Sequence, residues 1–177
     1  MVRKATSNDI KSIAALYDRV IDFQAANGSY MSWIKNVYPT ERTAADALLL
    51  DTLYVYDANG TVAGSVILDC IEPEDYKSLV WQTASDPRNT LIIHTLCVDP
   101  EYMGIGIATE MLSFAKKLAC ELNCASIRLA TNSKNLGAVN LYEKNGFVII
   151  GYNQAMLDGK ISCPRQCFME YVINDQN

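Results

Sequence analysis

The stretch Leu96-Cys-Val-Asp-Pro-Glu-Tyr-Met-Gly-Ile-Gly-Ile-Ala108 decides the fold, because it leads from an apolar strand into a helix through two glycines. The strand ends at Val98, since Pro100 lacks the backbone N–H that continued pairing needs. A helix N-terminus presents unpaired N–H groups and the positive end of the helix dipole. Glycine lets the backbone approach a phosphate with no Cβ in the way. Strand, glycine loop and helix therefore predict an anion site, with a pyrophosphate as its ligand.

Two other kinds of phosphate-binding loop do not fit this stretch. A Walker loop ends in Gly-Lys-Ser/Thr, whereas Gly106 is followed by Ile-Ala. A dinucleotide-binding loop needs G-x-G-x-x-G and an acidic residue at the end of the next strand. Here Thr109 occupies the position of the third glycine, and the next strand ends in Leu-Ala-Thr. Taken alone, the two glycines are also compatible with nothing more than tight packing.

Outward from this loop, hydrophobic periodicity and turn residues predict alternating strands and helices. Strands are expected at Val2–Ala5, Leu53–Asp57, Val62–Ile71, Thr90–Val98, Ser126–Thr131, Val148–Tyr152 and Phe168–Ile173. Helices are expected from a cap at Ser7 or Asn8 to about Ala25, from Thr40 to near Asp51, at Ile107–Asn123 and at Leu136–Asn145. Asn59–Gly60 supplies the positive φ angles of a tight hairpin turn. No linker divides residues 1–177, so we expect one α/β domain with a mixed central sheet of about six to seven strands flanked by helices.

The composition argues against several classes of function. The net charge is −5 and no cluster of Lys and Arg occurs, which disfavours binding to a nucleic-acid backbone. The longest apolar runs, such as Leu48–Leu50, are far too short to span a bilayer. Met1–Ala5 passes directly into a polar segment without an apolar signal core, so we expect a cytoplasmic protein.

Cysteine spacing raises the question of a zinc site, because two of the pairs among the six cysteines have the pattern C-x-x-x-C. The usual mixed sites need a second histidine, and the chain has one. One pair, Cys120 and Cys124, falls one turn apart on an expected helix. A reducing cytoplasm also disfavours disulfides. We therefore expect most cysteines to be small core side chains, and no metal.

A second motif, Asn135-Leu-Gly-Ala-Val-Asn-Leu-Tyr-Glu-Lys-Asn-Gly-Phe147, follows the expected strand after the long helix. It resembles the second signature of the GNAT superfamily of acyl-CoA-dependent N-acyltransferases, Asn-x-x-Ala-x-x-Leu-Tyr-Glu-Lys-x-Gly-Phe. The stretch from Val98 to Ala108 is similar to the main motif of that family, Val-x-Pro-x-x-Arg/Gln-Gly-x-Gly-Ile-Gly/Ala. The two motifs lie in the family's order, and the order of elements is similar over almost the whole chain. One position departs from the pattern, because Met103 stands where the family usually has Arg or Gln.

The resemblance implies acetyl-CoA as acyl donor and a splayed sheet, since in the family the fourth strand and the strand after its helix diverge around the pantetheine arm. The residues to which it gives a cofactor-binding role are Leu96, Cys97, Val98, Met103, Gly104, Ile105, Gly106, Ile107, Ala108, Asn135 and Tyr142. The backbone of Leu96–Val98 would bind the arm, the glycine loop would cradle the pyrophosphate, and the Asn135 amide would reach the arm. Because the phosphate contacts come largely from backbone N–H groups, Met103 should leave binding intact with a weaker affinity for the diphosphate.

Two side chains are candidates for proton transfer. The resemblance places the Tyr142 hydroxyl near the thioester sulfur, where it would protonate the departing thiolate. His94 is the single histidine and lies four residues before Val98, where many relatives carry a glutamate as general base. A neutral imidazole suits the removal of a proton from an amine. Both residues also have a structural interpretation, Tyr142 as a half-buried aromatic and His94 as a histidine on a buried strand.

A nucleophilic pair of His94 and Cys97 is a further alternative. Residues three apart on a regular strand face opposite sides, so the two side chains cannot meet. A bulge of the kind that the fourth strand of the family often has would change this parity.

The acceptor pocket is expected between the aromatic segment Gly28–Tyr38 and the connection Glu72–Trp81. Residues that could frame an amine by cation–π contact or pair with its charge are Tyr30, Trp33, Glu72, Tyr76 and Trp81, with Glu74 or Asp75 as other carboxylates. A packed core corner with a solvated acidic loop is the alternative for these residues.

The favoured activity is transfer of an acetyl group from acetyl-CoA to a primary amine of a small molecule or protein by direct attack. A non-catalytic acetyl-CoA-binding sensor or scaffold domain of the same fold is the alternative, motivated by Met103 and by the missing glutamate, and an acyl-CoA thioesterase is a third option. No nucleic acid and no membrane are expected as partners, and homodimerisation stays open.

Overall fold

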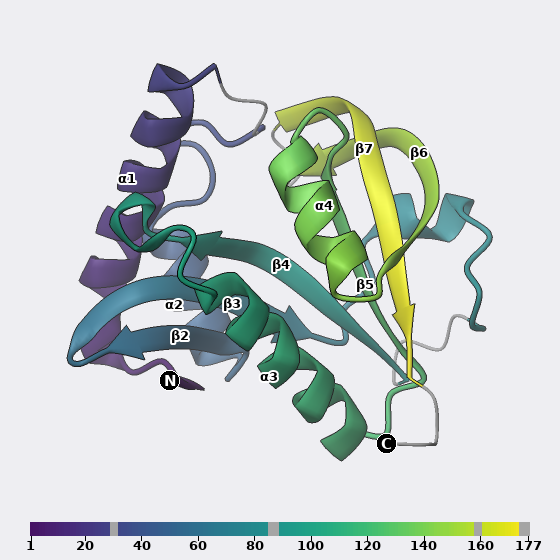
Figure 1. The fold of residues 1–177 in the computed structure, drawn as a ribbon, viewed down its shortest axis with the longest axis horizontal. Helices are drawn as coiled ribbons and strands as arrows, with labels where there is room; N and C mark the ends of the chain where they lie inside the picture. The colour runs from purple at the N-terminus through teal and green to yellow at the C-terminus, as the bar shows by residue number, and fades with distance from the viewer. Residues whose placement is uncertain (29–31, 85–88, 158–160, 174–177) are drawn as a thin grey trace.

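The structure, a computed structural model, describes residues 1–28, 32–84, 89–157 and 161–173. Within these residues, seven strands form one mixed sheet in the order β1-β2-β3-β4-β5-β7-β6, in which β4 and β5 are parallel and the other neighbours antiparallel (Figure 1). The strands are β1 Val2–Lys4, β2 Leu53–Ala58, β3 Thr61–Asp69, β4 Thr90–Val98, β5 Ser126–Asn132, β6 Val148–Leu157 and β7 Ile161–Val172. The helices are α1 Ile10–Ala26, α2 Glu41–Leu49, α3 Ile107–Glu121 and α4 Leu136–Lys144, with short 3-10 turns η1 Ser7–Asp9, η2 Glu74–Ser78 and η3 Pro100–Tyr102. The predicted α/β fold with a mixed, flanked sheet is confirmed.

Local signals placed most of these elements correctly. Asn59 and Gly60 have φ angles of 56° and 89°, the pair of positive values that a tight hairpin turn needs between β2 and β3. Thr40 caps α2 through a reciprocal contact with Thr43. The strand β4 has the predicted bounds, Thr90–Val98.

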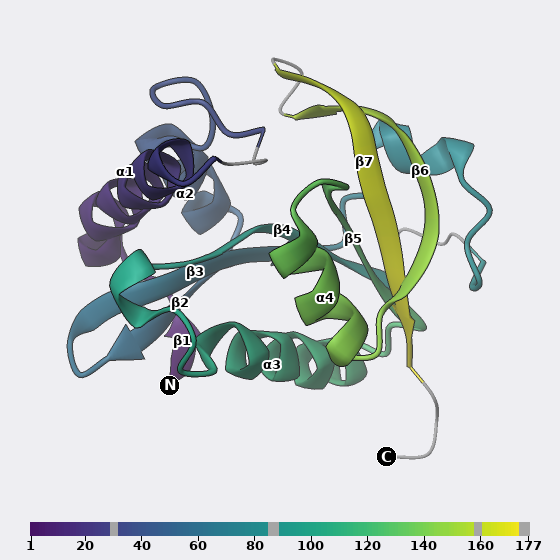
Figure 2. The same cartoon turned by 45° about the horizontal axis from the view of Figure 1, so that its top comes forward.

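The helices cover the two faces of the sheet. Figure 2 shows α1 and α2 on one face of the β1–β4 half and α3 on the other. The α1 face buries residues such as Leu16 and Val55, and the α3 face buries residues such as Met111 and Leu129. Residues of β4 contribute to the core on both faces of the sheet, because side chains alternate along a strand. None of the described helices combines the length and apolar character that crossing a membrane requires.

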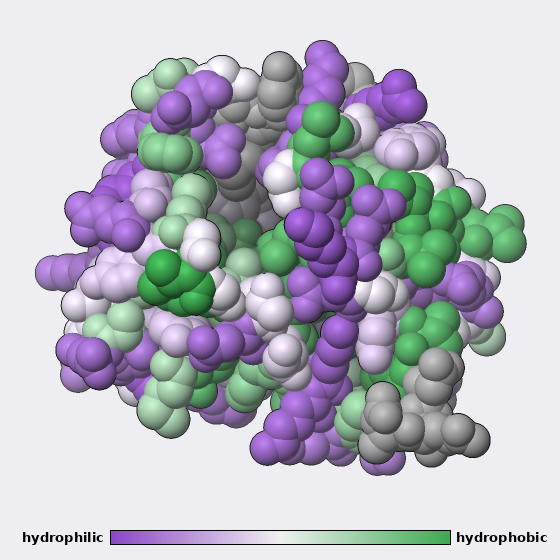
Figure 3. All heavy atoms as spheres, in the orientation of Figure 1, coloured by the Kyte–Doolittle hydropathy of each residue, from purple (hydrophilic) through white to green (hydrophobic). Residues whose placement is uncertain are grey.

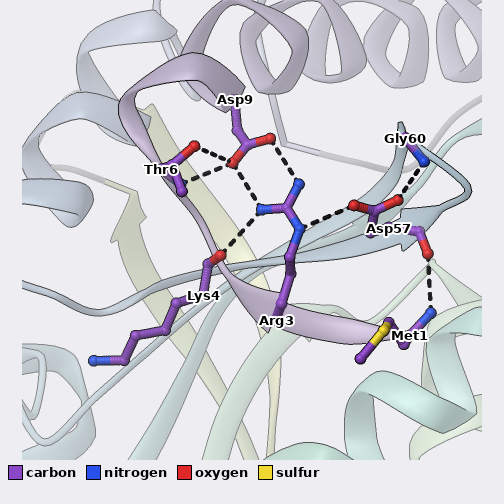
Figure 4. Close-up of polar contacts among 7 residues, drawn as sticks. All are labelled: Met1, Arg3, Lys4, Thr6, Asp9, Asp57 and Gly60. Carbon is purple, nitrogen blue, oxygen red and sulfur yellow. Dashed lines mark hydrogen bonds and ion pairs between the residues drawn. The ribbon is translucent and has the colours of Figure 1, made fainter.

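The N-terminal corner is fixed by ion pairs rather than by the predicted cap. The turn before α1 begins after Thr6, not Ser7 or Asn8, because the Asp9 carboxylate accepts hydrogen bonds from both the N–H and the hydroxyl of Thr6. Arg3 donates to both Asp9 oxygens at 2.8 and 3.0 Å and to Asp57 at 2.9 Å (Figure 4). Since Asp57 also accepts from the Gly60 N–H at 2.6 Å, the edge strand β1 is joined to α1 and to the β2–β3 turn.

The closing hairpin is longer than predicted. The strands expected at Val148–Tyr152 and Phe168–Ile173 extend to form β6 and β7, which pair from Val148↔Glu170 to Leu157↔Ile161. Polar residues such as Asn153 and Gln166 lie opposite each other in this register. The added residues are held by backbone pairing between the two strands. Because many of them are polar, the sequence there lacks the apolar alternation by which a strand is predicted.

Candidate active site

The site forms where β4 and β5 separate. Their parallel pairing runs from Thr90↔Ser126 to Ile93↔Leu129 and then stops. Beyond that point β4 stays paired with β3 and β5 stays paired with β7, but β4 and β5 no longer pair with each other and diverge (Figure 1). The splayed sheet that the family resemblance implied is therefore present.

A β-bulge lies in β4 at this point. Thr95 has a φ of 47°, and Thr95 and Leu96 together stand opposite the single residue Val66 of β3. The extra residue reverses the alternation of side chains, so His94 and Cys97 lie on the same face of the sheet, opposite Ile67 and Ser65. The regular-strand argument that separates these two side chains is therefore wrong.

The nucleophilic pair fails for another reason. Cys97 is buried in the core under α1, and burial raises the pKa of its thiol to about 12. A nucleophilic cysteine needs a lowered pKa, because the thiolate is the reactive form. Among the described residues no hydrogen bond joins His94 to Cys97, and the histidine contacts Asp69 instead.

A cavity of about 350 Å³ opens between the diverging strands. Figure 3 shows a hollow in the surface between the part over α1 and the part over α4. The lining residues that carry the argument below are Trp33, Asp75, Tyr76, His94, Leu96, Asn135 and Tyr142. The cavity therefore brings together predicted residues of β4, of the second motif and of both predicted acceptor segments, whereas no residue of the glycine loop lines it.

Tyr142 reaches the cavity from α4. The residue is 7 % exposed, and the centre of its ring lies 5.7 Å from that of Phe147 in an edge-on contact. Burial raises the pKa of the Tyr142 hydroxyl, so the group stays protonated around neutral pH. A hydroxyl that keeps its proton and faces a cavity can act as a proton donor.

His94 reaches the same cavity from β4. Its side chain is 27 % exposed, and its Nε2 lies 3.3 Å from Oδ1 of Asp69 at the end of β3. The two proton-transfer candidates, His94 and Tyr142, thus line one cavity from different elements.

The glycine loop, residues 101–106, precedes α3 and offers backbone donors to an anion. Gly104 and Gly106 have φ angles of 82° and 94°, which non-glycine residues rarely adopt. A Cβ built on either glycine would meet no atom within 4 Å, so open space lies in front of the loop. The first hydrogen bond of the helix runs from the Glu110 N–H to the Gly106 carbonyl at 3.0 Å.

The preceding N–H groups, those of residues 107–109, have no acceptor among the described residues. Unpaired donors at the start of a 15-residue helix fit the phosphates of coenzyme A. Met103, earlier in the same loop, is 43 % exposed and brings no charge.

Asn135 begins α4. Its side-chain oxygen accepts a hydrogen bond from the Ala138 N–H at 3.2 Å, and the residue lines the cavity. The cap occupies the amide oxygen and leaves the amide nitrogen as the donor that a ligand could meet.

The sequence profile of the acetyltransferase (GNAT) family matches residues 17–147, most of the chain. This protein belongs to the GNAT acetyltransferase family. Among curated proteins, an uncharacterized N-acetyltransferase of Methanocaldococcus jannaschii is 29 % identical over 97 residues, covering 55 % of this chain and 39 % of that protein. Streptothricin acetyltransferase of Escherichia coli is 34 % identical over 71 residues, covering 40 % of this chain and 37 % of that protein. The match thus spans less than half the length of these curated relatives.

Solved structures of the family share the fold over nearly the full length. A GNAT acetyltransferase of Streptococcus agalactiae superposes with a TM-score of 0.80 at 20 % identity, covering 99 % of this chain and 96 % of that one. The protein yncA of Salmonella typhimurium, solved with its cofactor acetyl-CoA, superposes with a TM-score of 0.69 at 18 % identity, covering 100 % of this chain and 95 % of that one.

The acceptor side of this GNAT domain differs in part from the prediction. Trp33 and Tyr76 line the cavity, and Asp75 lies on its wall. Tyr30 lies outside the described residues. Glu72 and Trp81 do not line the cavity, and both are held behind its wall by a buried arginine.

That arginine, Arg128, was not singled out by the sequence. It lies on β5 with no exposed surface and donates to Glu72 at 2.6 Å and to Glu170 at 2.9 Å. Its guanidinium also donates to the Thr83 carbonyl at 2.9 Å and lies 4.3 Å from the centre of the Trp81 ring. The segment from residue 72 to residue 83, called the acceptor wall below, is therefore tied to β5 and β7. A charged residue inside the apolar run Ser126–Thr131 was the available signal.

The remaining cysteines behave as core residues or surface thiols. The described cysteines are free, and four of the six are buried. Burial raises the pKa of the Cys124 thiol to about 11. Within the described part of the chain, no group of three or more His, Cys, Asp or Glu side chains is placed to hold a metal ion.

Proposed function

We propose that this protein transfers an acetyl group from acetyl-CoA to a primary amine of a small molecule or protein by direct attack. One observation carries the proposal. His94 and Tyr142 line a single cavity at the point where β4 and β5 separate. A proton acceptor and a proton donor in one cavity are what the exchange of a thioester for an amide requires.

The donor side rests on backbone groups. The N–H groups of residues 107–109, which have no acceptor in the described ranges of the chain, and the open space before Gly104 and Gly106 support binding of the pyrophosphate there, with Ile105 beside it. The backbone of residues 96–98, on the side of β4 that β5 leaves, and the Asn135 amide would bind the pantetheine arm. The contribution of Cys97 comes from its backbone, since its thiol lies in the core.

The reaction follows from the two proton-transfer groups. His94 takes a proton from the ammonium of the acceptor, and the neutral amine attacks the thioester carbonyl. Backbone N–H groups near Leu96 stabilise the oxyanion that forms. As the carbon–sulfur bond breaks, Tyr142 gives its proton to the departing thiolate, and the second proton of the attacking nitrogen passes to the Tyr142 oxygen as the amide forms. Coenzyme A and an acetylated amine result, with no oxidant or metal consumed.

The acceptor side supports a cationic amine as substrate. Trp33 and Tyr76 present aromatic rings to the cavity, and Asp75 adds a carboxylate to its wall. Aromatic faces attract ammonium groups, and a carboxylate adds to that attraction.

The test is release of free thiol from acetyl-CoA across a panel of amines, with calorimetric titration of coenzyme A beside it. We expect coenzyme A to bind and at least one amine to accelerate thiol release. Folded protein that fails to bind coenzyme A at millimolar concentration would overturn the assignment.

A second candidate function, that of a non-catalytic domain that binds acetyl-CoA, is favoured by one observation. Met103 places an uncharged, half-exposed side chain where the family motif has Arg or Gln. Binding of coenzyme A without thiol release for any amine, peptide amines included, would favour that function.

A further inference from the structure

The mechanism above leaves unused one carboxylate that touches the proposed base. Asp69 is the last residue of β3, and its Oδ1 lies 3.3 Å from the Nε2 of His94. The Asp69 side chain is 13 % exposed, so the contact is largely shielded from water. The same Oδ1 accepts the Ile71 N–H at 2.9 Å, which fixes the orientation of the carboxylate.

The sheet register accounts for this contact. His94 stands opposite Ile67, and Asp69 stands opposite Ile92. The two side chains are therefore diagonal neighbours on the same face of the β3–β4 pair, a spacing that a long side chain can bridge. Because the bulge begins only after His94, it leaves this register unchanged.

We propose that Asp69 is a positioning residue for His94 in acetyl transfer, a role that rests on the function proposed above. The carboxylate accepts the Nε2–H of the neutral imidazole and thereby sets its tautomer. Nδ1 then keeps its lone pair as the atom that takes the acceptor's proton. The imidazolium that forms donates the same hydrogen bond to a carboxylate, which stabilises it.

Other ionisable groups face the same cavity and must be separated from Asp69. Asp75 and Tyr76 line it from η2, Tyr38 from the segment before α2, and Tyr142 from α4. Among the described residues, Asp69 is the carboxylate within hydrogen-bond distance of the imidazole. Glu72 behind the wall is bound to Arg128.

The single histidine of the chain makes the proposal measurable without any assay of activity. In protein labelled with ¹⁵N-histidine, the ring nitrogens of His94 give one pair of resonances. At about pH 8.5, well above the ordinary imidazole pKa of about 6.5, we expect the Nε2–H tautomer with a downfield proton that exchanges slowly with water. In Asp69→Asn and Asp69→Ala this proton should shift upfield or disappear through exchange.

Turnover provides the second arm of the test. With one amine acceptor, we expect kcat to fall roughly 10- to 100-fold in both Asp69 variants, while the affinity for coenzyme A stays unchanged. Asp46→Asn makes the same change of charge on exposed α2 and should leave kcat and the resonance as in the wild type.

The outcomes separate the two proposals. An Nδ1–H tautomer in the wild type, or unchanged turnover in both folded Asp69 variants, would overturn the positioning role. A wild-type protein that shows the bonded Nε2–H but acetylates no amine would instead overturn the proposed function.

Discussion

The side of the site proposed for the acetyl donor is formed mainly by backbone groups, whereas the side proposed for the acceptor is formed by side chains. On the proposed donor side, the diverging end of β4 lines the cavity, and the glycine loop that follows it along the chain presents backbone N–H groups, whose positions follow from a turn and a helix start. On the acceptor side, the surface consists of side chains such as Trp33 and Tyr76, carried by segments more than forty residues apart in the sequence. The donor side therefore depends on local conformation, and the acceptor side depends on long-range packing.

This difference teaches where each side is vulnerable. A backbone site tolerates changes of side chain but not a change that blocks the approach of the ligand. A side-chain site depends on whatever holds its segments, here the Arg128 network behind the acceptor wall. Substitutions should therefore affect the two sides separately, except at Tyr142, where the sides meet.

The largest effect is expected from Tyr142→Phe. Removing the hydroxyl leaves the thiolate without its proton donor, so kcat should fall by ~10²–10⁴, with the affinity for coenzyme A nearly unchanged. Tyr54→Phe is the matched control, because Tyr54 is a buried tyrosine of the same core cluster with a ring neighbour at 5.0 Å, yet it does not line the cavity. Steady-state kinetics with one acceptor and calorimetric titration measure both quantities. Wild-type turnover in Tyr142→Phe would require another proton source.

Arg128→Met should break the acceptor side alone. The change removes the guanidinium that the buried carboxylates of Glu170 and Glu72 contact, which costs about 3–5 kcal/mol in free energy of unfolding. In the folded fraction, the affinity for coenzyme A should match the wild type. Arg42→Met removes an exposed arginine paired with Asp46 at 3.4 Å and should change stability by less than about 0.5 kcal/mol. Denaturant titration measures the free energy of unfolding of both variants. Equal losses of stability in the two variants would contradict the structural role of the Arg128 network.

Gly106→Ala should break the donor side alone. The added Cβ enters the open space before the loop, so affinity for coenzyme A should fall about tenfold or more, ~1.4 kcal/mol. The positive φ should also cost about 1–2 kcal/mol of stability. Gly60→Ala is closely matched, because Gly60 has a φ of 89° and also meets no atom within 4 Å, but it lies in the β2–β3 turn. If both variants bound coenzyme A equally well, the loop would not be the phosphate site.

The smallest effect is expected outside both sides, at the N-terminal corner. Hydrogen bonds from Arg3 lower the pKa of Asp9 from 3.8 to about 2. Because the folded-state pKa is depressed, the pair stabilises the protein above pH 3.8 and the contribution is lost as the pH falls through 2. Screening at the partly exposed Arg3 reduces it to about 1 kcal/mol. Unfolding of wild type and Asp9→Asn, followed from neutral to acid pH, should converge at the acid end. A constant difference would contradict the ion pair, and coenzyme A affinity should stay unchanged throughout.

Prediction from sequence succeeded where the cause is local. A proline and two glycines marked the loop before α3, Asn59–Gly60 marked a turn, and Thr40 marked a helix start, and each acts through its own backbone. These signals were sufficient for the sheet and the helices, and the donor site that they predict stays a prediction.

Prediction failed where the cause is a distant partner. Glu72 meets Arg128 across 56 residues of sequence, and no pattern near Glu72 distinguishes a buried ion pair from an acid that meets a ligand. Asp69 and His94 meet across 25 residues because of the β3–β4 register. His94 and Cys97 share a face of the sheet because of one extra residue in β4, and the pattern of residues in the strand does not reveal that bulge.

The chain has two tryptophans, of which one lines the cavity and the other does not. Trp33 lines the cavity, edge-on to Tyr17 at 6.1 Å. Trp81 belongs to the acceptor wall but does not line the cavity, because it is stacked on Tyr76 at 5.3 Å and lies against Arg128. Since indole emission responds to the polarity of its surroundings, each side carries its own fluorescent reporter. The single-tryptophan proteins Trp33→Phe and Trp81→Phe would let an optical titration distinguish a ligand that fills the cavity from one that displaces its wall.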